Sequence, residues 1–227
     1  MRLRPVLLFA LLLAPAAASL PASAAIIAVA SPAGLGATTT VNWDAFGPPG
    51  VYSTPPAVTA FGPRTVGFAS SLGILNRVNE GSGIVSNFLP GTPLLAQFTQ
   101  QDNFIVNFGA PVRGVGAPIQ DLQSGAFTAR MRFYDESSTL LGTVEAAGTN
   151  GGLENGAVPY LGGLSDAENI KYVLLSIVDP AVDFGQRENL AIGPLNFAVT
   201  ATQVPEPAST GLMVAGLLGL IGLRRRA

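Results

Sequence analysis

The chain has 227 residues, of which 48% are hydrophobic and 11% charged, with 12 lysines and arginines against 14 aspartates and glutamates. It contains neither cysteine nor histidine, which excludes disulfides, thiolate and imidazole metal sites, cysteine nucleophiles and serine–histidine triads. Five of the cationic residues lie near the two ends, at positions 2, 4 and 224–226. The middle of the chain is therefore mildly acidic, which argues against a nucleic-acid partner because such a partner needs a clustered basic surface.

The first element in chain order is typical of a secretory signal peptide. Two arginines precede the apolar stretch 6–13, and small residues follow, up to Ala22, Ser23 and Ala24. This order, ending in a small-x-small site, is that of a signal-peptidase substrate. We therefore expect residues 1–24 to form a signal helix that takes the chain to the Sec translocon. Signal peptidase would then leave Ala25 as the first residue of the mature protein.

The middle of the chain predicts an all-β domain over residues 25–203. Between residues 41 and 201, glycine, proline, serine, threonine and asparagine separate short apolar runs, and no long stretch repeats with helical periodicity. This pattern favours a β-sandwich. The clearest predicted strands are 103–108, 126–134, 140–146, 172–178 and 195–201.

Two of these strands indicate how the sheet is buried. In 126–134 apolar and polar residues alternate, which predicts one buried and one solvated face. Strand 172–178 is apolar on both sides and is predicted to be central. Residues 135–138 are expected to form a hairpin turn, and 166–169 a short helical turn. Gly114-Val115-Gly116 is interpreted as a strand-edge bend rather than a nucleotide-binding motif.

Candidate site residues in this domain are few. Acidic residues occur in small clusters within predicted turns, where solvated acids are expected, and so a pair of catalytic carboxylates is not favoured. Calcium is a weak candidate, with hard oxygen ligands from Asp135, Asp166, Glu168 and Asp179. Trp43, between the polar residues Asn42 and Asp44, is the best candidate for an exposed ring that contacts a glycan, whereas core packing is expected to take most of the tyrosines.

The last element is a short apolar segment that ends in arginines. No charge occurs from Ala208 to Leu223, and each leucine, isoleucine and valine in this run favours membrane insertion by about 0.3–0.6 kcal/mol. The run is shorter than the roughly 20 residues of an ordinary span and contains four glycines. We expect it to be a marginal transmembrane helix in the inner membrane. By the positive-inside rule, its cytoplasmic stop is formed by Arg224, Arg225 and Arg226.

The residues before this helix carry a resemblance. Val204-Pro205-Glu206-Pro207, an apolar glycine-bearing helix and a terminal arginine cluster occur in that order, which resembles the PEP-CTERM sorting signal of Gram-negative bacteria that make exopolysaccharide. The resemblance covers residues 204–227. It implies that an exosortase, a multi-pass membrane cysteine protease, recognises Pro205, Glu206 and Pro207. Cleavage would remove the temporary anchor and pass the protein to the cell surface or the medium.

The body carries a second resemblance. The series NFGAPVRGVGAPIQ, FTARMRFYDESSTLLGTV, VPYLGGLSDAENIKYVLLSI and LAIGPLNFAV is similar to the jelly-roll β-sandwich of many exported PEP-CTERM proteins. Those domains resemble carbohydrate-binding modules in fold. Such domains often end on an Ile-Asp-Asn-Leu strand. Here Gly193 and Pro194 stand in place of the Asp and Asn.

Together these features indicate an exported, non-catalytic protein of the cell surface or extracellular matrix, without a cofactor and associated with exopolysaccharide or biofilm. A lectin-like module that binds a carbohydrate or calcium is the alternative. A polysaccharide-acting enzyme is a more remote one, because two carboxylates suffice for glycoside hydrolysis.

Overall fold

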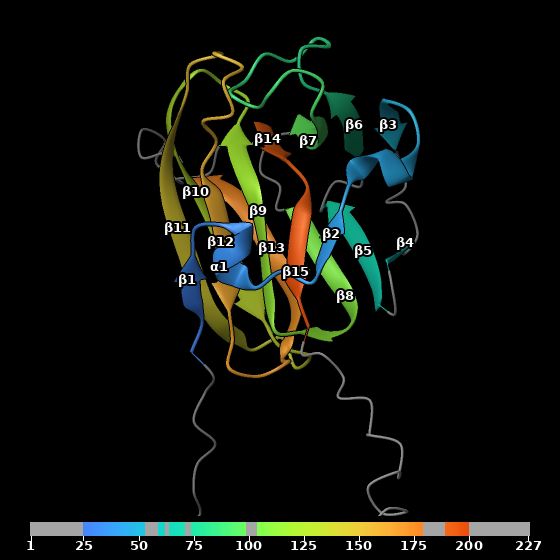
Figure 1. Cartoon of the computed structure of the whole chain (residues 1–227), viewed down its shortest axis with the longest axis vertical. Helices are drawn as coiled ribbons and strands as arrows, with labels where there is room; N and C mark the ends of the chain where they lie inside the picture. Colours follow the sequence, from blue (N-terminus) through green and yellow to red (C-terminus); the bar gives the residue numbers. More distant parts are fainter. Residues whose placement is uncertain are drawn as a thin grey trace, which may run out of the picture.

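The computed structural model describes residues 25–52, 59–61, 64–70, 74–98, 104–178 and 189–199, and in this part of the chain the predicted two-sheet, all-β sandwich is confirmed (Figure 1). The predicted signal helix and transmembrane helix both lie outside the described residues. Within those residues, no helix has the length and apolar character needed to cross a membrane.

The first sheet has six antiparallel strands. Its spatial order is β11 (Leu140–Asn150), β10 (Gly125–Tyr134), β13 (Ile170–Val178), β8 (Phe104–Val112), β5 (Arg64–Ser70) and β4 (Thr59–Phe61). The predicted strands 103–108, 126–134, 140–146 and 172–178 all fall in this sheet. The turn predicted at 135–138 joins β10 to β11, where the backbone N–H of Ser138 donates to the carbonyl of Asp135.

The second sheet has nine strands, and several of them are ones that the sequence did not indicate. Its main path is β1 (Ile27–Val29), β12 (Tyr160–Leu164), β9 (Gly114–Asp121), β14 (Asn189–Ile192), β7 (Pro93–Phe98), β6 (Leu75–Asn79) and β3 (Gly50–Tyr52). Next to β9, β15 (Leu195–Ala198) also pairs with β2 (Thr39–Val41). Two short helices lie between the first strands, α1 (Pro32–Leu35) and the 3-10 helix η1 (Trp43–Phe46).

Two local predictions are wrong. Residues 166–168 form a bend and not a helical turn. Gly114 and Gly116 lie within β9, which pairs with β12, β14 and β15 and is therefore a central strand rather than an edge bend. The two glycines are needed because a side chain at either position would collide with neighbours: an added Cβ would lie 2.8 Å from Leu35 Cδ1 at Gly114 and 2.6 Å from Tyr160 Oη at Gly116.

The main core lies between the two sheets. On β10 the alternation is as predicted, with Phe127, Ala129, Met131 and Phe133 buried and the arginines between them half-buried. Strand β13 contributes Val173, Leu175 and Ile177 to the same core and is central in its sheet, as predicted. A smaller core covers the opposite side of the nine-stranded sheet, formed by Ile84, Phe88, Leu94, Ala96 and Ala191.

The chain enters and leaves the sandwich at the same end. In the nine-stranded sheet, Ile27 is paired with Leu164, Leu164 with Gly114, and Gly114 with Ala198. The first residue of β1 and the last residue of β15 therefore lie in one row, three strand spacings or about 14 Å apart. Figure 1 shows the loop between β6 and β7 and the loop between β11 and β12 at the opposite end.

Candidate functional site

Trp43 is a core residue, and the prediction that it forms an exposed glycan platform is wrong. Its side chain is 0% exposed, its indole N–H donates to the carbonyl of Ile192 at 3.0 Å, and its ring meets that of Phe68 edge to face at 5.1 Å. The polar neighbours have structural roles that the sequence did not reveal. Asn42 caps η1 by accepting from the backbone N–H of Asp44, whose carboxylate pairs with Arg77.

The reason for this arrangement is the tight turn of η1. Successive residues of a 3-10 helix point about 120° apart, so Trp43 enters the core while both polar neighbours remain exposed. Strands β14 and β15 follow one another along the same side of β9 and are separated by Gly193 and Pro194. At this break in the ladder the carbonyl of Ile192 is available to the indole. Pro194 has no N–H to donate.

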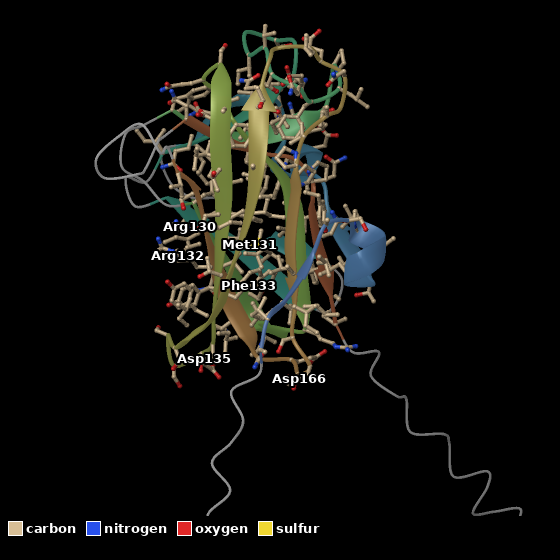
Figure 2. All side chains as sticks on the ribbon, turned by 90° about the vertical axis from the view of Figure 1, so that its left-hand side faces the viewer. Arg130, Met131, Arg132, Phe133, Asp135 and Asp166 are labelled. Atoms are coloured by element: carbon tan, nitrogen blue, oxygen red, sulfur yellow. The ribbon has the colours of Figure 1, made fainter. Side chains whose placement is uncertain are left out.

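The three described calcium candidates lie on two turns. Asp135 is in the β10–β11 turn, where Oδ1 accepts from the backbone N–H of Thr139 at 2.7 Å. Asp166 is exposed and Glu168 half-buried in the bend after β12, whereas Asp179 lies outside the described residues. Figure 2 shows Asp135 and Asp166 at the same end of the sandwich. In the described part of the chain, no three acidic side chains come together to hold a metal ion.

The residues predicted to direct processing fall mostly outside the described part of the chain. This applies to Ala22 and Ala24 of the signal site, to Pro205, Glu206 and Pro207, and to the arginines at 224–226. Ala25, the expected first residue of the mature protein, is the first described residue and is exposed.

Core packing is expected to take most of the tyrosines, but two of them lie on the outer face of the six-stranded sheet. Tyr134 of β10 is directly opposite Tyr172 of β13, and their rings are stacked with centroids 4.8 Å apart and an interplanar angle of 7°. Both side chains are half-buried. The alternation in β10 could have revealed this, because Tyr134 follows Phe133 and must point the other way.

Two arginines share this outer face but differ in their partners. Figure 2 shows Arg130 and Arg132 directed away from the side on which Met131 and Phe133 enter the core. Arg130 Nε donates to Glu145 Oε1 on β11 at 2.5 Å. For Arg132, the described residues include no hydrogen-bond or ion-pair partner.

Tyr160 lies on the other outer face, against two glycines of the nine-stranded sheet. An added Cβ at Gly116 or Gly162 would be 2.6 Å from its Oη or 3.1 Å from its Cε1. Burial raises the pKa of Tyr160 from 10.0 to about 12, and its buried Oη has no hydrogen-bond partner among the described residues. The neutral phenol is therefore the form that fits the folded protein.

This pKa predicts a loss of stability at alkaline pH. Because the folded-state value is raised above the ordinary one, the contribution of Tyr160 is fully present below pH 10.0 and is lost as the pH rises through about 12. We expect Tyr160→Phe to unfold at a higher pH than wild type in a titration followed by circular dichroism. Tyr52→Phe, which removes a phenol that donates to the carbonyls of Phe46 and Pro48, is the control. An equal shift in both variants would contradict the prediction.

Comparison with known proteins identifies one sequence motif in this chain. Residues 203–226 match the model of the PEP-CTERM protein-sorting motif. No curated protein matches the chain.

Two solved structures are similar to parts of the body. One is CsCBM6-3 from Clostridium stercorarium in complex with cellobiose, with 17% identity over 54% of this chain and 87% of that one and a TM-score of 0.29. The other is a glycoside hydrolase family 43 arabinoxylan arabinofuranohydrolase from Bacillus subtilis in complex with cellotetraose, with 13% identity over 63% of this chain and 40% of that one and a TM-score of 0.31. Both scores are too low to extend those proteins' ligands to this chain. The chain thus carries a PEP-CTERM protein-sorting motif behind a two-sheet β-sandwich, and the motif implies export, processing by an exosortase and a place at the cell surface.

Proposed function

We propose that this is a non-catalytic protein of the cell surface or extracellular matrix, which is anchored briefly in the inner membrane and associates with exopolysaccharide after release. The observation that carries the proposal is the sorting motif at residues 203–226. From the sequence, we expect the two prolines at 205 and 207 to favour an extended backbone around Glu206, as a protease substrate requires. The apolar run that follows holds this segment at the membrane surface until it is cut.

The side chains of the body support a structural rather than a catalytic role. Without histidine or cysteine, catalysis would depend on carboxylates. Among the described residues, the acids singled out by the sequence lie on two turns, and two other carboxylates take part in internal contacts. Glu80 is 2% exposed and accepts from the N–H and hydroxyl of Ser86, and Asp44 pairs with Arg77.

The ends of the released protein test the proposal. We expect intact-mass analysis of protein from the culture medium to give a chain that begins at Ala25 and stops before the apolar run 208–223. The chain should be recovered from cells that contain their own exosortase. A mass that includes residue 1 would contradict the export route, and a mass that includes the arginines at 224–226 would contradict exosortase processing.

A lectin-like role is the second candidate, and a specific observation favours it. The stacked, half-buried rings of Tyr134 and Tyr172 lie on an outer face of the sandwich, and aromatic rings that combine apolar faces with a polar tip are suited to wet interfaces. This candidate is compatible with the first, because a matrix protein needs a means of holding its polysaccharide.

A further inference from the structure

On the outer face of the six-stranded sheet lie several polar side chains for which the described residues provide no hydrogen-bond or ion-pair partner. Strand register places Asn107 of β8 opposite Tyr172 of β13, and Tyr172 opposite Tyr134 of β10. Arg132 is two residues before Tyr134 on β10 and therefore points to the same side. We call these four residues the tyrosine face. Asn107 is exposed and the other three are half-buried.

The charge on this face is unusual for the protein. The whole chain has a formal net charge of −2, even with five cationic residues near its ends. The other cationic side chains that the structure describes have partners: Arg77 pairs with Asp44, Arg130 with Glu145, Arg113 donates to the carbonyl of Ser165, and Lys171 to that of Gly109. Arg132 has none among the described residues. Its guanidinium is thus available to an external anion.

The tyrosines add an apolar surface beside this charge. Their rings are parallel and as far apart as neighbouring strands, so they stand side by side on the sheet. One ring face of Tyr172 is therefore turned toward β8, where the neighbouring side chain is Asn107 and the next residue in the row is Gly67 of β5. Both neighbours are smaller than a phenol ring, and Tyr172 is half-buried rather than fully buried.

The dimensions suit a sugar unit. Three strands span about 10 Å across the sheet, and residues two apart on one strand are separated by about 7 Å. The amide of Asn107, the two phenol groups and the guanidinium of Arg132 therefore lie within an area comparable to one or two pyranose rings. Of these groups, only the guanidinium carries a charge, and it forms strong paired hydrogen bonds with carboxylates.

We propose that the tyrosine face binds a carboxylate-bearing polysaccharide, of the class of polyuronates. Arg132 binds the carboxylate, Tyr172 packs against the C–H face of the sugar ring, and Asn107 bonds to a hydroxyl group. This inference rests on the proposed association with exopolysaccharide and adds to it the chemistry and the residues of the contact. It predicts that binding weakens with salt, because an exposed ion pair is screened.

The test measures binding of polygalacturonate to the full chain, solubilised in a neutral detergent, by isothermal titration calorimetry at low ionic strength. We expect Arg132→Gln to weaken binding by about tenfold or more, the usual size of a lost charged hydrogen bond. Arg113→Gln makes the same change in net charge away from the tyrosine face and should alter affinity by less than about twofold. Tyr172→Val, which keeps β propensity, should also weaken binding.

Methyl-esterified polygalacturonate separates charge from stacking. Esterification removes the carboxylate charge, so it should weaken wild-type binding and abolish the difference between wild type and Arg132→Gln. Equal affinity of wild type for both polymers, or equal affinity of Arg132→Gln and wild type for the acidic one, would overturn the proposal. Melting curves of all variants establish that they are folded. Release into the medium should be unchanged in Arg132→Gln, so a failure of the sorting model is seen separately from a failure of this site.

Discussion

Glu206→Ala is expected to accumulate as an uncut protein in the inner membrane. The free energy of insertion comes from the uncharged run 208–223 and from the arginines that follow it, none of which this change alters. Glu206 is the only charge between the two prolines of the motif, so its loss acts on recognition by the exosortase. We expect the released fraction to fall by about tenfold or more, an order-of-magnitude expectation for loss of a charged recognition contact. Immunoblots of membrane and medium fractions measure this.

Gln203→Ala is the matched control for this experiment. It shortens a polar side chain at the border of the motif but leaves Pro205, Glu206 and Pro207 in place. Its release should equal that of wild type. Normal release of Glu206→Ala would show that the protease does not read Glu206. Wild type that stayed at full length in the membrane would show that the tail is a permanent anchor rather than a processing site.

Trp43→Ala is expected to cause the largest loss of stability in the sandwich. Removing a fully buried aromatic side chain lowers the free energy of unfolding by about 3–5 kcal/mol. It also leaves the carbonyl of Ile192 without the indole donor. For a domain of this size the melting temperature should fall by about 10 °C, as measured by circular dichroism. Trp43→Phe keeps a ring between Phe46 and Phe68 and should lose less.

Fluorescence distinguishes a buried Trp43 from an exposed Trp43 that contacts a glycan. Because Trp43 is the only tryptophan, its fluorescence reports on this one position. In wild type the emission should be that of an indole shielded from water, insensitive to added sugars and poorly quenched by acrylamide. Strong quenching in the folded state, or a Trp43→Ala variant that melts as wild type does, would contradict a core role.

The parts of the fold that were predictable are those where side chains alternate. The strand β10 could be derived from its pattern of large apolar and charged residues, since each face of the strand has one environment. Strand β9 could not. Its outer face is covered by Leu35 and Tyr160, so its glycines serve close packing, yet in the sequence they are indistinguishable from a bend.

In the candidate site, too, some features could be predicted from the sequence and others could not. Polar neighbours suggested that Trp43 was exposed, but exposure of Asn42 and Asp44 says little about a residue between them in a 3-10 turn. Tyr134 could be placed on the outer side of its strand from alternation, but Tyr172 could not, because its strand is apolar on both sides. Their contact could not be predicted, because it depends on the register between β10 and β13, which are separated by 35 residues.

The row that joins Ile27 to Ala198 limits where the tail can be cut. From Val199 to Pro205 the chain spans at most about 20 Å when fully extended. A protease that reads the motif while the sandwich is folded must therefore have its active site within that reach of the sheet end, close to the bend at Asp166 and the turn at Asp135. The folded body would thus set an upper limit on the distance between the sheet end and the enzyme, and a bulky insertion into either turn is expected to obstruct the enzyme without changing its recognition sequence.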